Sequence, residues 1–478
     1  MHVSRFWRTL TLSSPRLWAG VRITGIRNHK KSKLPRWSDG LEHCDSAPRL
    51  QSALMRAGAV PLDVCISDFY DFYGTQEEDH RTHQALLKEG CKMGVDNWKS
   101  LEIMLHVRSV DRLLHGRFAS LEELSICGFQ PSVLHHLLVD APRLRTITLR
   151  HVCLRPWAVL PFWSKIRSFS FARITSFDND EFDAFSTILE TSQSLESLQI
   201  ELQDICPPQW APLHSRMPIV FPHLRSLTYH GHWAIPIVAP NLTQLAIKDI
   251  RLPELLQTDY LDGASFIEMP HLIQLSLTCT ILSDLAILRA LRLKDLTLRS
   301  MMKPNTNEGL ASVWTHETGE KSGNGSGLFP SLSILRLENF TASFTVLRSA
   351  LECLSPQLHQ LHFKNCSLPR TFFRVFCGGS PRHSALSTSA SAAQTSHSPP
   401  PLLPPRQARY LCPSLEIMSI VIHERARADK RVIRRALLDL VHIRKISGLN
   451  LDSLMVDWDE SGKREELVHH GSSNSFMG

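Results

Sequence analysis

The chain has 478 residues, of which 43% are hydrophobic and 21% are charged, and it carries a net charge of +7. This composition provides for a sizeable core and excludes wholesale disorder, while the charge excess is too small for this length to indicate nucleic-acid binding. The longest apolar stretches, such as residues 233–239, fall far short of the roughly 18–20 residues of a membrane helix, which argues against a membrane protein.

The chain begins with a basic segment. Residues 1–36 contain nine Lys or Arg residues and no Asp or Glu. A basic, acid-free start that contains serine is also typical of a mitochondrial transit peptide, so a mitochondrial location is one interpretation. The eleven cysteines are scattered without a C-x-x-C pair, which favours a reducing compartment, the cytoplasm or the nucleus, as the main interpretation.

A six-residue unit, L-x-x-L-x-L with apolar substitutes, recurs along the rest of the chain at spacings mostly near those of leucine-rich repeats. Its second and third apolar residues are two apart, so they face the same side of a short strand, and stacked parallel strands bury them in one core. The eleven units begin at Leu121, Leu144, Ile166, Leu195, Leu224, Leu242, Leu272, Leu293, Leu332, Leu358 and Leu415.

Two positions around the unit carry further information. Proline stands two residues before the first leucine in seven units, where its fixed φ suits a chain entering a strand: Pro142, Pro222, Pro240, Pro270, Pro330, Pro356 and Pro413. The Asn or Cys that standard repeats place eight residues after the first leucine is mostly missing, and only Cys366 fits well. We therefore expect an irregular solenoid in which the usual side-chain hydrogen bonds to the loop backbone are replaced or absent.

Two low-complexity or polar stretches interrupt the repeat, at residues 303–327 and 378–408. We interpret both as insertions; the second, rich in Ser, Ala and Pro, is a passive excursion or a docking or phosphorylation segment. Residues 178–181 predict a polar turn that caps a helix over 182–189, and residues 431–441 have helical spacing and are expected to cap the stack after its last repeat.

The N-terminal motif SRFWRTLTLSSPRLWAGVRI (residues 4–23) resembles the closing part of an F-box, and residues 47–66 (APRLQSALMRAGAVPLDVCI) are similar to the helix, small-residue turn and strand that follow it in fungal, mushroom-type F-box/leucine-rich-repeat proteins. The residues that match the F-box motif are Trp7, Leu10, Pro15, Leu17 and Trp18. In that family the F-box binds the adaptor subunit of an SCF-type, cullin-based ubiquitin ligase, and its first two helices precede the part that is matched here. The resemblance therefore implies an N-terminally incomplete F-box, with these five residues as candidate adaptor contacts or, alternatively, as core residues.

The expected fold is α/β: an irregular leucine-rich-repeat solenoid, with a curved parallel sheet and helices or loops outside it, preceded by a short α-helical F-box remnant. The expected domains are a helical segment over 1–27, a basic linker and helix over 28–60, a solenoid over 61–460 and a flexible tail over 461–478. By resemblance, the protein would recruit a protein substrate to the ligase. The alternative is a repeat scaffold for protein interaction with no ligase link.

No catalytic set, metal site or cofactor motif is found. The pairs His230-x-His232 and His359-x-x-His362 lack Cys or carboxylate partners at ligand spacing, and we expect solvent-facing histidines there. The motifs of phosphate-binding loops, dinucleotide sites and serine hydrolases are missing as well. We therefore expect a protein that is not an enzyme, that needs no cofactor and that binds neither membrane nor nucleic acid.

Binding is expected on the outward face of the strands. The residues two, four and six after the first leucine point away from the core, and across the array they are polar and mixed in sign. Such a face suits recognition of a protein segment by hydrogen bonds and ion pairs. The candidate substrate-binding residues are Arg150, Glu201, His230, Lys248, Asp295, Arg299, Arg336, Glu338, His362 and Lys364.

Overall fold

The structure of the protein is a computed structural model. It describes residues 4, 13–24, 42–44, 47–67, 95–104, 117–128, 141–173, 178–202, 218–231, 235–250, 252–256, 267–279, 285, 288–300, 329–340, 351, 357–366, 412, 414–421, 430–446, 451–457 and 464–469. The chain divides into two compact units: unit 1 comprises Met1–Leu242 and Glu254–Gln257, and unit 2 comprises Thr243–Pro253 and Thr258–Gly478. The short helix α7 (Leu252–Leu255) lies where the chain passes between the two sets of residues.

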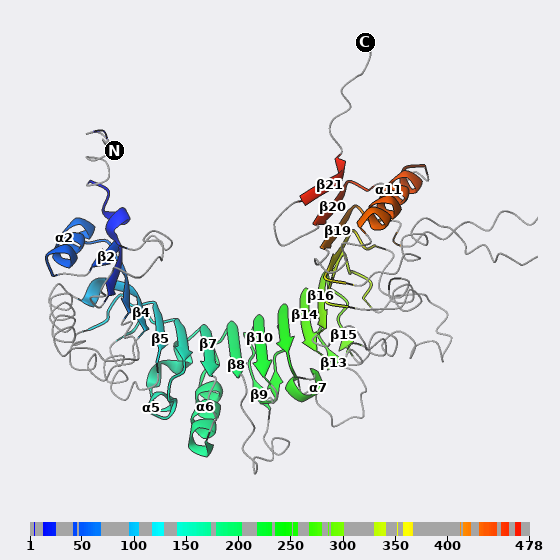
Figure 1. The fold of residues 1–478 in the computed structure, drawn as a ribbon. Helices are drawn as coiled ribbons and strands as arrows, with labels where there is room; N and C mark the ends of the chain where they lie inside the picture. Colours follow the sequence, from blue (N-terminus) through cyan, green and yellow to red (C-terminus); the bar gives the residue numbers. More distant parts are fainter. Residues whose placement is uncertain are drawn as a thin grey trace, which may run out of the picture. The chain divides into compact units, whose positions relative to one another are not determined.

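Unit 1 is built on a parallel sheet (Figure 1). In spatial order its described strands are β2, β1, β3, β4, β5, β6, β7, β8 and β10, so the sheet follows chain order except at its first edge. The strand bounds are β1 (Gly20–Thr24), β2 (Glu42–Cys44), β3 (Leu62–Ser67), β4 (Trp98–Met104), β5 (Glu123–Cys127), β6 (Thr146–Arg150), β7 (Ser168–Arg173), β8 (Ser197–Leu202) and β10 (Ser226–Gly231). A short parallel pair, β9 (Ile219–Val220) and β11 (Ile237–Val238), forms a separate ribbon.

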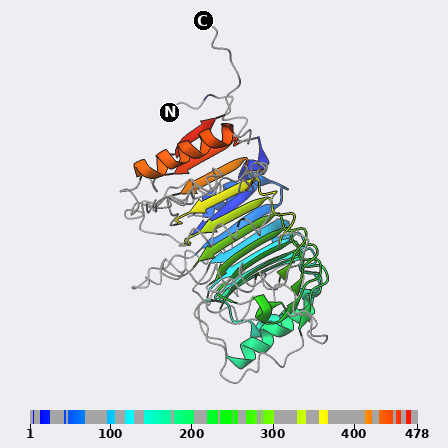
Figure 2. The same ribbon diagram turned by 90° about the vertical axis from the view of Figure 1, so that its right-hand side faces the viewer.

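Unit 2 repeats the plan. Its described strands pair in chain order, and every pairing is parallel except the last, β20 with β21. The bounds are β12 (Gln244–Lys248), β14 (Gln274–Cys279), β16 (Asp295–Ser300), β17 (Ile334–Glu338), β18 (Gln360–Lys364), β19 (Ile417–Val421), β20 (Ser453–Asp457) and β21 (Arg464–His469). A separate parallel pair is formed by β13 (Ile267–Glu268) and β15 (Leu288–Arg289). Successive strands within each unit are stacked like rungs (Figure 2).

All eleven predicted units form strands, and each strand begins two residues after the first leucine. The backbone N–H of that leucine commonly donates to the carbonyl three residues earlier, as Leu144 does to Ala141 at 3.2 Å and Leu332 to Phe329 at 3.1 Å. Each pair closes a four-residue turn whose second position holds Pro142 or Pro330, where the fixed φ of proline is preferred. Proline thus marks the turn into the strand, as the sequence indicated.

Inside each strand the apolar side chains alternate with polar ones. In β7, Phe169 and Phe171 are buried, and their rings lie near those of Trp163 and Phe185, with the Phe171 and Phe185 centroids 5.1 Å apart. In β17 the buried pair is Leu335 and Leu337. The parallel register places the matching residue of the next strand beside each of these, which gives each unit a continuous core.

The expected replacement for the missing Asn ladder is visible one residue before the consensus position. Counting the first leucine as position 1, position 8 has a left-handed backbone at His151 (φ 56°), Asp249 (φ 65°), Asn339 (φ 61°) and Asn365 (φ 55°). Each backbone N–H there donates to a carbonyl at the end of the next strand, with distances from 2.8 to 3.1 Å. Position 9 is then occupied by buried apolar residues in three of these units: Val152, Ile250 and Phe340.

Cys366 is the exception that the sequence singled out. Its Sγ donates to the carbonyl of Leu337 at 3.2 Å, so a side-chain hydrogen bond to the neighbouring repeat is made there. Burial raises the pKa of this thiol to about 11. In these units, burial of an apolar side chain at position 9, or the thiol contact of Cys366, therefore takes the place of the side-chain hydrogen bonds that Asn makes in standard repeats.

Helices lie outside the unit 1 sheet (Figure 1). The short elements α5 (Arg155–Ala158) and η5 (Pro161–Lys165) follow β6, and α6 (Asn179–Thr191) follows β7. Asp178 caps α6, because its side chain accepts a hydrogen bond from the backbone N–H of Glu181 at 2.9 Å. The predicted cap and helix are confirmed, but the helix extends from Asn179 to Thr191, so only Asp178 of the predicted turn lies outside it.

The predicted C-terminal helix is α11 (Lys430–Ile446), but the repeat does not end with it. Arg444, buried on this helix, donates to the carbonyl oxygens of Leu415 at 3.0 Å and Cys412 at 3.3 Å, which fixes α11 beside the turn into β19. A further unit then begins at Leu451, and its strand β20 pairs with β19. The expected flexible tail over 461–478 is also wrong in part, because residues 464–469 form β21 on the open edge of β20.

The N-terminal boundaries need correction as well. The helical segment expected over 1–27 is wrong for residues 20–24, which form β1 and pair in parallel with β3, placing buried Val21 beside Val64. Within the expected linker and helix over 28–60, residues 42–44 form β2, and the helix is α2 (Ala47–Ala57). The helix, turn and strand predicted over 47–66 are confirmed by α2, by Gly58 at φ 60° and by β3.

Two units escaped the pattern. One begins at Trp98 and the other at Leu451; both first residues are buried, and the units form β4 and β20. The insertions predicted at 303–327 and 378–408 lie outside the described residues. Parallel strands in repeat register, turns closed by the first leucine and helices or loops outside the sheet define an α/β leucine-rich-repeat solenoid.

Candidate functional site

The candidate binding surface is the outward face of the strands at positions 3, 5 and 7 of each repeat, called the strand face below. The register aligns these positions into rows that run across neighbouring strands. Adjacent strands are about 4.8 Å apart, so equivalent side chains in one row are near neighbours.

Position 7 of unit 2 forms the row richest in charge. Lys248, Arg299 and Lys364 lie on it at β12, β16 and β18, and we call these three residues the basic row. Glu338 of β17 stands between Arg299 and Lys364 and contacts both, at 3.0 Å from Arg299 Nε and 4.0 Å from Lys364 Nζ. The Arg299 and Lys364 side chains are 46% and 50% exposed, whereas that of Glu338 is 21% exposed.

The remaining candidates of unit 2 adjoin this row. Arg336 of β17 forms an ion pair with Asp295 of β16. His362 of β18 shares hydrogen bonds with Ser419 Oγ at 2.5 Å and Gln360 Oε1 at 3.4 Å. Burial first, and then the positive charge of Arg336, lowers the pKa of His362, while the charge of Asp295 opposes this shift.

The structure thus brings six predicted residues together over β16–β18 and shows that two of them, Asp295 and Glu338, are occupied by cations of the same face. The expectation of solvent-facing histidines needs correction, because His362 is only partly exposed and its ring nitrogens are hydrogen-bonded.

In unit 1 the predicted residues are fewer, and three of them lie in the row of position 7 on β6, β8 and β10: Arg150, Glu201 and His230. His230 and Glu201 lie opposite one another on β10 and β8, with Nδ1 3.5 Å from Oε1, and the His230 side chain is also mostly covered. Arg150 is exposed at the end of β6, next to Cys127 and Ala172 in register. His232 lies outside the described residues.

Positions 3 and 5 of unit 1 hold a feature that was not predicted. Most of these positions on β5–β10 carry small hydroxyl side chains, each only partly exposed: Ser125, Thr146, Thr148, Ser168, Ser170, Ser197, Ser226 and Thr228. These two rows on β5–β10 are therefore mostly uncharged and able to donate and accept hydrogen bonds. Their signal in the sequence is the alternation of Ser or Thr with apolar residues along these strands.

The candidate adaptor contacts are described in part. Pro15, Leu17 and Trp18 form the short helix η1 (Pro15–Trp18), in which Leu17 is 61% exposed. The guanidinium of Arg56 on α2 lies 4.3 Å from the Trp18 ring centroid, and Met55 on the same helix is 64% exposed. Trp18 is therefore only partly covered, and Leu17 is free of the core. Trp7 and Leu10 lie outside the described residues.

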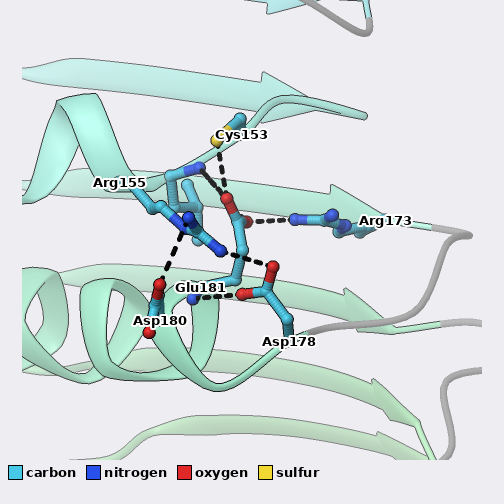
Figure 3. A network of polar contacts seen from close by, with 7 residues as sticks. Cys153, Arg155, Arg173, Asp178, Asp180 and Glu181 are labelled. Atoms are coloured by element: carbon cyan, nitrogen blue, oxygen red, sulfur yellow. Dashed lines mark hydrogen bonds and ion pairs between the residues drawn. The ribbon is translucent and has the colours of Figure 1, made fainter.

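A buried polar network outside the strand face links β6 to α6 (Figure 3). Glu181, almost fully buried, accepts hydrogen bonds from Cys153 Sγ at 2.6 Å and from the backbone N–H of Leu154, and it forms an ion pair with Arg173. Burial and the contact with Glu181 raise the pKa of Cys153, so this thiol is held in its neutral, donating form.

The outer part of the same network is exposed. Arg155 contacts Asp178 at 2.5 Å and Asp180 at 3.2 Å, and its guanidinium is the main cause of the lowered pKa of Asp178 (Figure 3). Both carboxylates belong to the start of α6, where negative charge is favourable. The network joins helix capping to the end of β6, and we assign it a structural role.

Among the described residues, no cluster of three or more His, Cys, Asp or Glu side chains has the arrangement of a metal site. In the same part of the chain, no helix is long and apolar enough to span a membrane.

Comparison with known proteins adds little to the assignment. No protein-family model matches the chain, and no curated protein matches it. Among solved structures the chain is similar to an internalin from Listeria monocytogenes, with 13% identity and a TM-score of 0.31 over 68% of this chain and 89% of that one. The repeat register of the chain itself therefore defines the fold.

Proposed function

We propose that this protein binds another protein through its strand face and performs no chemistry of its own. The observation that carries this proposal is the alignment of mainly polar side chains in rows over each unit, interrupted by apolar residues such as Ala172, Ile334 and Ile417, on a surface whose backbone is fixed by parallel pairing. A rigid face of hydrogen-bonding and charged groups suits recognition of a polypeptide segment, because many groups are placed before the partner arrives.

Site-specific photo-crosslinking tests this use of the face. A photoreactive residue replaces Ser170 in unit 1 or Ser276 in unit 2, both at position 5 of their repeats. The matched control positions are Gln193 and Arg292, which are exposed in the turns before β8 and β16. Protein adducts formed in a eukaryotic extract from the face positions and not from the turn positions are expected; equal adducts from both sets would overturn the proposal.

We further propose that the N-terminal segment connects the bound protein to a cullin-based ubiquitin ligase. The resemblance of residues 4–23 to the end of an F-box supports this role, as does the exposure of Leu17 and Met55 beside Trp18. Large apolar side chains that stay exposed on adjacent helices are typical of a docking surface. The chain would then raise the effective concentration of its partner near the ligase.

The second candidate function is a protein-interaction scaffold with no ligase link. It is favoured by the replacement of the expected helix over 20–24 by strand β1, which continues the repeat sheet toward the N-terminus. Failure of adaptor binding together with crosslinking at the strand face would select this alternative.

A further inference from the structure

The basic row of unit 2 has a regular spacing. Register pairs Lys248 with Thr278, Thr278 with Arg299, Arg299 with Glu338 and Glu338 with Lys364. The three cations are therefore each separated by two strands, which corresponds to about 10 Å at the usual distance between strands.

Positive charge is outermost on this row. Glu338 is the acid between Arg299 and Lys364, and its side chain is less exposed than either of theirs. Lys248 lies 3.9 Å from the carboxylate of Asp249, which is also the more covered member of its pair. An approaching partner thus meets ammonium and guanidinium groups before it meets carboxylates.

The side chains at position 5, beside the row, change in size along it. Position 5 carries Ala246 on β12, Ser276 on β14 and Thr297 on β16, so short side chains adjoin the first half of the row. On β17 and β18 the same position holds the longer side chains of Arg336 and His362.

The chemistry of the face favours a protein over a nucleic acid. The described positions 3, 5 and 7 of β12–β19 carry no Phe, Tyr or Trp on which bases could stack. Asp295 and Glu338 would repel a continuous phosphate backbone, whereas a peptide with separated acidic side chains can avoid them.

We infer that the basic row binds an extended protein segment in which acidic side chains recur at every third residue. In a polyproline II conformation, such side chains project on one side about 9 Å apart, which matches the interval between Lys248, Arg299 and Lys364. This inference rests on the proposed protein-binding function and names the chemical class of the partner.

Fluorescence anisotropy with defined probes tests the inference on the full chain. The probe is a fluorescein-labelled peptide of repeated Pro-Ser-Glu triplets, and its isomer has the same composition with the glutamates grouped at one end. The test variant combines Arg299→Gln with Lys364→Gln. The matched control combines Arg292→Gln with Lys294→Gln, which removes the same charges from exposed positions of the turn into β16.

Loss of both row cations is expected to weaken binding of the triplet peptide by about tenfold, and the turn variant by less than about twofold. The grouped isomer is expected to bind more weakly than the triplet peptide. Equal weakening by both variants, equal binding of both isomers, or absence of peptide binding would overturn the inference. Equally tight binding of a single-stranded oligothymidylate of the same charge would overturn it in favour of nucleic acid.

Failure of the acidic-segment inference can be distinguished from failure of the proposed protein-binding function. If the triplet peptide does not bind but crosslinking from Ser276 still yields protein adducts, the acidic segment is wrong and the protein-binding face stands. If face and turn positions crosslink alike, the proposed function itself is wrong.

Discussion

Arg299 and Glu338 stand opposite one another on β16 and β17, and the carboxylate of Glu338 lies 3.0 Å from Arg299 Nε and 4.0 Å from Lys364 Nζ. A single partly covered acid thus contacts two exposed cations of the strands on either side of it. The pairing leaves cationic groups, rather than a neutral pair, at the surface.

Replacement of this acid should therefore strengthen binding of acidic peptides. In Glu338→Gln the two cations lose their internal counter-charge and become available to a ligand, and we expect about threefold tighter binding of the Pro-Ser-Glu peptide. Anisotropy titration measures the effect, with Glu268→Gln, an exposed acid of β13, as the control for net charge. Weaker binding of Glu338→Gln would show that the acid positions the cations instead of competing with the ligand.

The histidine beside this row makes stability depend on pH. The pKa of His362 is lowered in the folded protein from its usual value of 6.5, because the ring is partly buried and Arg336 is near, with Asp295 opposing and the neutral Ser419 and Gln360 as hydrogen-bond partners. The unfolded chain then takes up a proton before the folded one. The contribution of neutral His362 to the stability of the fold is fully present above pH 6.5, and it is lost as the pH falls through the lowered pKa that His362 has in the folded protein. His362→Gln should lose less thermal stability between pH 7 and pH 5 than the parent; identical losses would contradict this.

The buried ion pair of Glu181 and Arg173 should matter far more for folding than the pairs at the surface. Glu181→Gln removes the charge from a side chain that is 4% exposed and that pairs with Arg173, itself 14% exposed, so we expect a loss of about 3–5 kcal/mol in the free energy of unfolding. Urea denaturation provides the measurement. Glu196→Gln, from the exposed pair with Arg167, is the control and should cost about 0–1 kcal/mol. Similar losses in the two variants would refute the structural role of the network.

The left-handed residue at position 8 predicts an asymmetric response to substitution. Asn365 has φ 55°, a conformation that a β-branched residue adopts only under strain. Asn365→Val is expected to destabilise the fold by about 1–3 kcal/mol, whereas Asn365→Gly should change stability by less than about 1 kcal/mol. Equal destabilisation by valine and glycine would indicate that the Asn side chain, rather than the backbone, is what matters there.

The repeat was predictable because burial dictates its spacing. The eleven units obey the alternation of a half-buried strand, and the proline present in seven of them marks a turn whose hydrogen bond closes on the first leucine. The units at Trp98 and Leu451 also match the repeat when Trp98 and Val456 are counted as apolar substitutes, so the sequence carries the signal for them as well.

The sequence predictions are wrong for segments where they rest on the F-box resemblance or where the segment has no apolar alternation. The F-box resemblance predicts a helix at residues 20–24, although Val21 and Ile23 already show the alternation of a strand. Strand β21 has no apolar alternation and forms because β20 presents an open edge, which is a tertiary effect. The candidate face was foreseen by position, but the pairing of Asp295 and Glu338 with neighbouring cations depends on strand register that no single repeat displays.

The most direct test of the proposed link between recognition and ubiquitin transfer is calorimetric titration of the full chain with the purified ligase adaptor. The account predicts binding at about micromolar affinity, weakened at least about tenfold by Leu17→Asp, because that side chain is exposed and its substitution spares the core. A chain carrying a complete F-box serves as the positive control. Binding by the control alone, or equal binding by the Leu17→Asp variant, would contradict the ligase link and leave a protein-binding scaffold.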